Sequence, residues 1–178
     1  MQLNHGFLIL NKPKGITSRQ LVNQINRQTP LKVGHTGTLD PLASGMMILC
    51  LGDATRFSQF VITSDKAYEA DIAFGQQTQT DDCEGEVILE SHQLITEIDI
   101  THTLPNFTGI ISQTPPLHSA IHINGQRAYK LARKNINFQI LSRDVHIHTI
   151  KLLAFDQDTQ RAKLYIHCQS GTYIRSIA

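Results

Sequence analysis

One carboxylate, Asp40, stands in a stretch whose composition would hold it rigidly. The stretch reads GHTGTLDP from Gly34 to Pro41. Gly34 and Gly37 allow backbone conformations closed to residues with a Cβ, while Pro41 fixes its own φ and favours an extended Asp40. The sequence therefore predicts an acid held on a stiff loop at the edge of the core. The alternative is that Asp40 only starts a turn, because Asp-Pro pairs commonly do so.

The elements around this loop follow from hydrophobic spacing. The apolar run 46–51, which Gly52 ends, predicts a buried strand directly after the loop. Upstream, the sequence predicts a strand over 6–10, a turn reading KPKGITS, and a helix with Ser18 as its N-cap and apolar residues at Leu21, Val22 and Ile25. Helix amides and lysines both attract anions, so this turn could contact phosphate. It could equally be an ordinary turn.

Tyr68 lies at the start of the next predicted strand, 68–74, which follows a predicted helix over 57–62. Alternation places its ring on the same face as the apolar residues, and the pattern alone favours a core tyrosine with its hydroxyl satisfied. The polar loop 75–85 contains Asp81, Asp82 and Glu84 without the ligand spacing of an EF-hand. We therefore expect a solvated hairpin tip there.

The segment 107–133 mixes small, aromatic and basic residues after two prolines, Pro115 and Pro116. Adjacent prolines favour an extended backbone. Arg127 can pair with phosphate and Tyr129 can stack on a base, so the segment suits a mobile loop that grips RNA. The alternative is a surface loop whose charges have no special role.

The remaining segments are predicted to form strands and helices that support the fold. We expect a short strand at 87–89, a helix around 97–104, strands over 143–148, 152–155 and 162–166, and the first turns of a helix over 172–178. His146 and His148 point to one face of a strand and could bind a metal. We discount a metal site, because the sequence places no third ligand and exposed strand histidines are common.

The composition is that of an ordinary globular domain: 178 residues, 40% hydrophobic and 17% charged. No membrane span, signal peptide or disulfide pattern is evident, so we expect a cytoplasmic monomer with reduced cysteines. The net charge of +1 hides an asymmetry. Residues 1–64 and 109–178 are basic and residues 65–108 are acidic, which permits a basic face toward a polyanion.

Several of these stretches, in this order, resemble the tRNA pseudouridine synthases of the TruB type. They are KPKGITS, GHTGTLDP, KAYEADIAFG, the pattern QTPPLHSA with GQRAY, and GTYIR. The resemblance implies that Asp40 is the nucleophile, that Tyr68 stacks on the target base, and that Arg175 pairs with Asp40. The residues that it implies bind substrate are Lys12, Gly34, His35, Thr38, Arg127, Tyr129 and Tyr173. His122 and Ser170 replace lysines that are usual in the family.

The resemblance further implies an α+β fold, with a mixed, largely antiparallel sheet flanked by helices and a central catalytic cleft. Its activity would convert uridine to pseudouridine at position 55, in the T loop of tRNA, by flipping the base out, without a metal or other cofactor. Arg175 would orient Asp40 and favour its ionised form, and His35 would fill the vacated stack. Residues 1–178 would form the catalytic domain, incomplete at its C-terminus and without the family's C-terminal PUA domain.

Two other classes of function remain open from the sequence. A tRNA-binding or folding module without turnover would use the same basic segments, and a shortened catalytic domain makes it plausible. An unrelated hydrolase could use Asp40, but it needs a base that activates water, and the sequence offers none.

Overall fold

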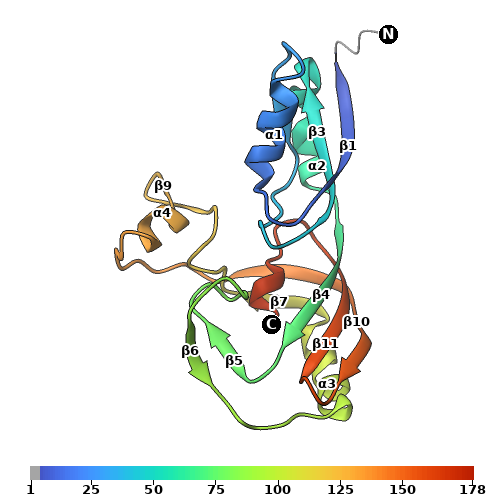
Figure 1. Cartoon of the computed structure of the whole chain (residues 1–178), viewed down its shortest axis with the longest axis vertical. Coiled ribbons are helices and arrows are strands. Elements are labelled where there is room, and N and C mark those ends of the chain that lie inside the picture. The colour runs from blue at the N-terminus through green and yellow to red at the C-terminus, as the bar shows by residue number, and fades with distance from the viewer. Residues whose placement is uncertain (1–4) are drawn as a thin grey trace. The chain divides into compact units, whose positions relative to one another are not determined.

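The computed structural model describes residues 5–178, and the chain divides into two compact units, Met1–Ser64 and Asp65–Ala178. Figure 1 shows their helices and strands. Each unit has its own sheet and its own hydrophobic core. Among residues 5–178, no helix combines the length and the apolar character that a membrane crossing requires.

The first unit is a three-stranded antiparallel sheet with one principal helix. Its elements are β1 (Gly6–Lys12), α1 (Ser18–Asn26), β2 (Val33–His35), β3 (Gly45–Leu51), a 3₁₀ turn (Gly52–Phe57) and α2 (Ser58–Ile62). The strand order is β1-β3-β2, so β3, the strand that follows the Asp40 loop, is central. Leu21 and Val22 of α1 pack with Met47 and Leu49 of β3.

Helix α1 begins with a capping box. Thr17 is the N-cap; its hydroxyl accepts a hydrogen bond from the amide of Gln20, and the Gln20 side chain accepts one from the Thr17 amide. The prediction that Ser18 is the N-cap is therefore wrong by one residue. Ser18 is the first helical residue, and its side chain is buried. The reason is a long-range contact described below.

The second unit is built on a four-stranded antiparallel sheet in the order β4-β11-β10-β7. The sheet strands are β4 (Lys66–Ala73), β7 (Gly109–Gln113), β10 (Arg143–Asp156) and β11 (Arg161–Cys168). Smaller elements are β5 (Gln76–Thr78), β6 (Val87–Glu90), α3 (Glu97–Thr103), a 3₁₀ turn (Leu104–Phe107), β8 (His122–Ile123), β9 (Gln126–Arg127), α4 (Ala128–Ala132) and a 3₁₀ turn (Ile174–Ser176).

Alternation along the strands decides which face of this sheet carries the core. Leu164, Ile166 and Cys168 of β11 are buried, and they pack with Ile72 of β4 and with Ile100 of α3. Residues between them on β11 point to the opposite face. The α+β class and the largely antiparallel sheet are as predicted.

Two predicted boundaries are wrong. The strands expected over 143–148 and 152–155 form one strand, β10, whose register shifts twice against β11. Such bulges interrupt the alternation that a sequence pattern relies on, without ending the strand. The helix expected over 172–178 is a single 3₁₀ turn at Ile174–Ser176.

Candidate active site

The loop that carries Asp40 is held by hydrogen bonds on both sides of this residue. The Ser18 hydroxyl donates to the carbonyl of Leu39 (2.9 Å) and accepts from the Leu39 amide (2.9 Å). The Gly15 amide donates to the carbonyl of Pro41 (2.8 Å). Both neighbours of Asp40 in the sequence are thus bound to the KPKGITS turn. The stiffness predicted for this loop has a physical source in these contacts.

Gly15 and Lys12 shape the turn that makes these contacts. Gly15 has φ of +87°, a conformation that residues with a Cβ rarely adopt. Lys12 is completely buried, and its ammonium donates to the carbonyls of Pro13 (2.9 Å) and Ile16 (2.8 Å). Burial lowers the pKa of Lys12, and the charge of Asp40 opposes that effect. The contact of Lys12 with substrate stays a prediction; its observed contacts hold the turn.

Ser18→Ala is predicted to loosen the Asp40 loop. The substitution removes the two part-buried hydrogen bonds that the hydroxyl makes with the amide and carbonyl of Leu39, each worth ~0.5–1.5 kcal/mol of folding free energy. Thr17→Ala, the adjacent control, removes only the helix cap and costs ~1 kcal/mol.

The two variants are separated by the turnover rate of the reaction for which Asp40 is the predicted nucleophile. If Ser18 positions Asp40, Ser18→Ala lowers kcat by up to ~100-fold, whereas Thr17→Ala leaves it nearly unchanged. Equal kcat values in the two variants would contradict this role of Ser18.

The other predicted residues of this loop differ in how far they are buried. His35 and Gly34 belong to β2 and pair with Leu49 and Cys50 of β3. Burial lowers the pKa of His35, which favours its neutral form, and its Nδ1 has no hydrogen-bond partner among residues 5–178. Thr38 is exposed. A neutral, half-buried imidazole on the strand leading to Asp40 suits a stacking role.

The two glycines of GHTGTLDP do not have the conformation expected of them. Neither Gly34 nor Gly37 has a positive φ, and a Cβ added at Gly34 meets only the Thr55 methyl at 3.9 Å. The prediction that they supply special backbone angles is wrong, because Gly34 lies in a regular paired strand. The glycine that does adopt a positive φ is Gly15, in the neighbouring turn.

Tyr68 occupies the predicted position on β4 in the second unit. It pairs with Ile166 of β11, and its half-buried ring packs against the core of that unit. A ring that is partly covered on its core side is fixed in orientation. This arrangement fits both readings of Tyr68, a core residue and a stacking platform.

Arg175 ties together three segments of the second unit that lie far apart in sequence. Its guanidinium donates to the carbonyls of Thr80 (2.8 Å) and His118 (3.1 Å), and to the Asp82 carboxylate (3.2 Å). The side chains of Arg175 and Asp82 are only 15% and 9% exposed. Asp82 also accepts from the Thr80 hydroxyl (2.6 Å) and the Glu84 amide (3.0 Å).

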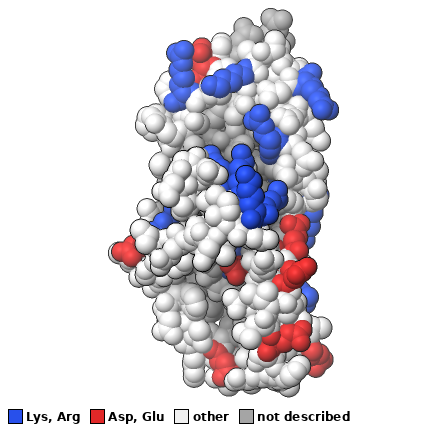
Figure 2. Space-filling view, turned by 90° about the vertical axis from the view of Figure 1, so that its left-hand side faces the viewer, with Lys and Arg blue, Asp and Glu red and all other residues white. Residues whose placement is uncertain are grey.

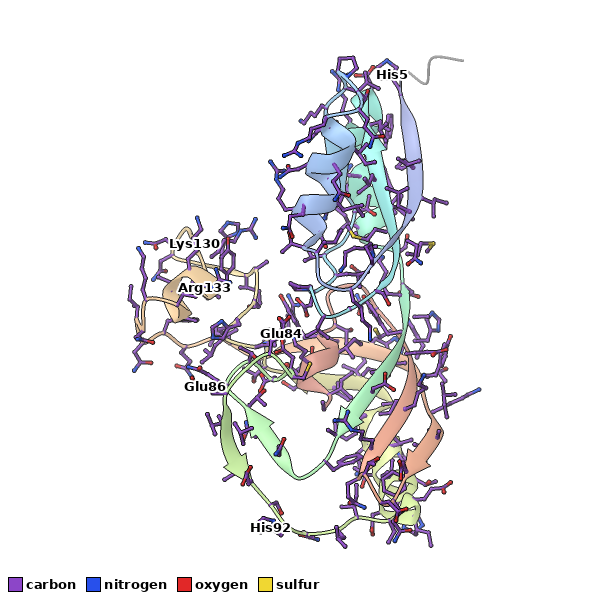
Figure 3. All side chains as sticks on the ribbon, in the orientation of Figure 1. His5, Glu84, Glu86, His92, Lys130 and Arg133 are labelled. Atoms are coloured by element: carbon purple, nitrogen blue, oxygen red, sulfur yellow. The ribbon has the colours of Figure 1, made fainter. Side chains whose placement is uncertain are left out.

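Asp82 was predicted to belong to a solvated hairpin tip, and this is wrong. Its partner lies 93 residues later in the chain, which no local pattern reveals. Asp81, beside it, has φ of +55°, and burial raises the pKa of its carboxyl. Asp82 adds to this shift, while Arg175 and His118 oppose it. Only Glu84 of the three acids is exposed (Figure 3).

Asp81→Asn is predicted to stabilise the chain at neutral pH. Because the folded pKa of Asp81 lies above the unfolded one, its ionisation penalises the folded state. This penalty is absent below pH ~3.9, grows as pH rises from there to the folded pKa, and is constant above it. Asparagine carries no charge and tolerates the positive φ. Urea unfolding should show the gain at pH 7.5 and a smaller gain on acidification.

Asp71→Asn is the control for that measurement. Asp71 is exposed on β4, so its replacement should change stability by less than ~0.5 kcal/mol. A loss of stability in Asp81→Asn at pH 7.5, or a gain that grows on acidification, would contradict the prediction.

Tyr173, another predicted site residue, is held through its backbone. The buried Gln113 side chain accepts from the Tyr173 amide (2.8 Å) and donates to its carbonyl (3.0 Å). The Arg143 guanidinium lies 5.4 Å from the centre of the Tyr173 ring and also donates to the Gly171 carbonyl. Gln113 and Arg143 are positioning residues that the sequence reasoning did not identify. Gln113 is the first residue of the QTPPLHSA stretch, so that stretch was the sequence signal that could have identified it.

The predicted RNA-gripping segment folds as a small hairpin and helix. Strands β8 and β9 precede α4; Arg127 donates to the Ala120 carbonyl, and Arg133 lies 5.6 Å from the centre of the Tyr129 ring. Figure 3 shows Lys130 and Arg133 on this segment. Residues 100–143 include no Asp or Glu. The segment therefore offers cations and a tyrosine ring with no acid of its own to oppose them.

The charge asymmetry of the sequence is visible on the surface. In Figure 2 the first unit is found by the grey residues at its end, and the coloured side chains on it are mostly Lys and Arg. Residues 1–64 carry only two acids, Asp40 and Asp53. Asp53 contacts His5 (3.4 Å) and Arg56 (4.0 Å) at the surface.

The fold has counterparts among solved structures. A chain of a crystal structure of a Cbf5-Nop10-Gar1 complex matches with a TM-score of 0.70 at 28% identity, over 98% of this chain and 42% of that one. A chain of the archaeal box H/ACA sRNP Nop10-Cbf5 complex matches with a TM-score of 0.67 at 26% identity, over 98% and 41%. The class is thus an α+β fold shared with these chains of Cbf5 complexes.

Sequence relatives identify the family. Residues 23–174 match the model of the TruB family pseudouridylate synthase N-terminal domain. The tRNA pseudouridine synthase B of Ehrlichia chaffeensis is 42% identical, over 98% of this chain and 59% of that protein. The protein of the same name from Agrobacterium fabrum is 47% identical, over 97% and 55%. The chain belongs to the TruB family of pseudouridylate synthases, and it spans a little over half the length of these relatives.

Proposed function

We propose that this chain isomerises uridine to pseudouridine in the T loop of tRNA, at position 55, with Asp40 as the nucleophile. The observation that carries the proposal is the loop of Asp40, which is bound on both sides by the KPKGITS turn. A carboxylate fixed in this way can meet a substrate without first being ordered. Membership of the TruB family supplies the reaction.

The reaction sets the demands on the site. The glycosidic bond from C1′ of the ribose to N1 of uracil breaks, the base turns, and a bond from C1′ to C5 forms. The proton of C5 is lost and N1 gains one, so the isomerisation is balanced without an oxidant or reductant. The enzyme must hold a detached base while a carboxylate acts on the nucleotide.

Each predicted site residue has a role in that scheme. Asp40 acts on the nucleotide, Tyr68 stacks on the extruded base, and Arg175 orients the carboxylate. His35 fills the space that the base leaves in the RNA stack. Extrusion costs a few kcal/mol, and stacking of the imidazole and of the tyrosine ring offsets part of it. The guanidinium of Arg175 has a carboxylate partner in Asp82, which fixes its plane.

The choice of tRNA as substrate rests on the relatives and on charge. The relatives are named tRNA pseudouridine synthase B. The segment with Arg127, Tyr129 and Lys130 carries cations for phosphate and a ring for a base. Gly34, Thr38, Lys12 and Tyr173 complete the set that we propose for substrate binding, Lys12 by holding the turn beside Asp40.

The test is to incubate the chain, in excess, with an unmodified tRNA transcript and to map pseudouridine at single-nucleotide resolution. The expected result is one pseudouridine, in the T loop. A transcript with cytidine at that position should bind equally and yield no product. Binding of tRNA without any product would favour a binding module, and modification outside the T loop would contradict the assigned substrate.

A further inference from the structure

Two histidines and one acid gather on the face of the second sheet that does not carry the core. On β11, buried Ile166 and Cys168 flank His167, so the His167 side chain points to the opposite face. His167 pairs with Ala67 of β4, and Asp65, two residues before Ala67, lies on the same side of that chain. Strand order therefore brings Asp65 beside His167.

A β-bulge adds the third member. The register between β10 and β11 shifts between Ile147 and Thr149, which makes His148 the extra residue of the bulge. Bulges re-aim a side chain relative to the regular alternation. The rings of His148 and His167 lie with their centres 4.8 Å apart, and the rings of His146 and His148 meet edge-on with their centres 4.4 Å apart.

The donor atoms of these three residues converge. Nε2 of His148 lies 3.0 Å from a carboxylate oxygen of Asp65, and one ligand atom from each of Asp65, His148 and His167 lies within 4.8 Å of the others. Nε2 of His148 is buried and makes no hydrogen bond of acceptable geometry, despite its closeness to the acid. A buried imidazole nitrogen without an aligned partner is costly unless something else binds it.

We propose that Asp65, His148 and His167 bind a divalent transition metal, with Zn²⁺ as the best match. Imidazole nitrogen and carboxylate oxygen are Zn²⁺ ligands, and two histidines exclude a preference for Mg²⁺ or Ca²⁺, which select oxygen. Bonds of about 2.0–2.2 Å in tetrahedral geometry place the donor atoms roughly 3.4 Å apart. The three donors lie within 4.8 Å of one another, so metal binding would draw them closer together.

The bound metal would connect Asp65, just before β4, to His148 on β10 and His167 on β11. Three protein ligands leave one tetrahedral position for water or an external ligand. Binding of the metal would stabilise this corner of the sheet, because the unfolded chain does not hold the three donors together. The proposal is independent of the activity assigned to Asp40, since it uses none of the residues assigned to that reaction.

The alternative for the same residues is an ion pair between Asp65 and a protonated His148, with the rings of His146 and His167 packed against that of His148. The experiment is calorimetric titration of the metal-free chain with ZnCl₂, and separately with MgCl₂. The variants are His148→Ala, His167→Ala and Asp65→Asn. Asp65 is exposed, so Asp65→Asn preserves packing if a histidine variant fails to fold. The control is His92→Ala, an exposed histidine on the segment after β6 (Figure 3).

The expected result is one Zn²⁺ per chain and no measurable binding of Mg²⁺. Each of the three ligand variants should weaken Zn²⁺ binding by more than the ~10–100-fold that loss of an outer partner costs, while His92→Ala leaves it unchanged. Co²⁺ in place of Zn²⁺ should give the visible absorption of a tetrahedral site, which Asp65→Asn removes. Absence of Zn²⁺ binding, or equal affinity in the parent chain and Asp65→Asn, would overturn the proposal.

Discussion

Replacing Asp40 by asparagine is expected to lower the rate of pseudouridine formation by roughly 10⁴-fold or more, the size of loss that removal of a nucleophile causes. Asparagine has nearly the same size and can keep the loop contacts of Leu39 and Pro41, because those contacts involve backbone atoms on either side. Only the charge and the nucleophilic oxygen are lost. Binding of tRNA should therefore change little, and the defect should appear in kcat.

Asp53→Asn is the matched control, because Asp53 is the other acid of residues 1–64. It lies at the surface near His5 and Arg56. Its replacement should leave kcat within about twofold, since surface substitutions of this kind have small effects. Single-turnover rates on an unmodified tRNA transcript provide the comparison. Comparable rates for Asp40→Asn and Asp53→Asn would remove Asp40 from the chemistry.

The second large effect is expected at Arg175. Arg175→Ala leaves the Asp82 carboxylate, only 9% exposed, without its cationic partner, and breaking a buried pair from one side costs ~3–5 kcal/mol. Two carbonyls, of Thr80 and His118, lose a donor in addition. Urea unfolding should register the loss, and hydrogen exchange should increase at residues 80–85.

Two further variants separate the role of Arg175 from general charge effects. Arg175→Lys keeps the charge but cannot reproduce the three contacts of a planar guanidinium, so it should recover only part of the stability. Glu69→Gln breaks the exposed pair with Lys163 (3.7 Å) and should cost less than ~1 kcal/mol. Equal losses in Arg175→Ala and Glu69→Gln would show that the cluster around Arg175 contributes nothing special.

The sequence predicted the elements whose signals are local. Alternation along β4 placed Tyr68 on the core side, and the apolar run before Gly52 predicted β3, the strand behind the Asp40 loop. These predictions succeed because a half-buried strand or a buried strand must show that pattern wherever it occurs. The resemblance to the TruB family was also readable, and the family match over residues 23–174 confirms it.

The contacts that hold the site were not predictable, because their partners lie far apart in sequence. Thr17 and Ser18 are neighbours with the same capping chemistry, and only the distant Leu39 decides which one caps α1. In the same way, the polar composition of the loop around Asp82 indicated a solvated carboxylate, whereas Asp82 pairs with the distant Arg175. His148 required a bulge, and bulges leave no mark in an alternating pattern.

The most direct test of the central claim is a crystal structure of Asp40→Asn bound to the T stem-loop of tRNA. The variant keeps the loop and removes turnover, so the uridine should be trapped before the glycosidic bond breaks. The target uridine is expected to be extruded from the loop, with its ribose and base beside residue 40. A uridine that remains stacked within the RNA loop, or one bound away from residue 40, would contradict it.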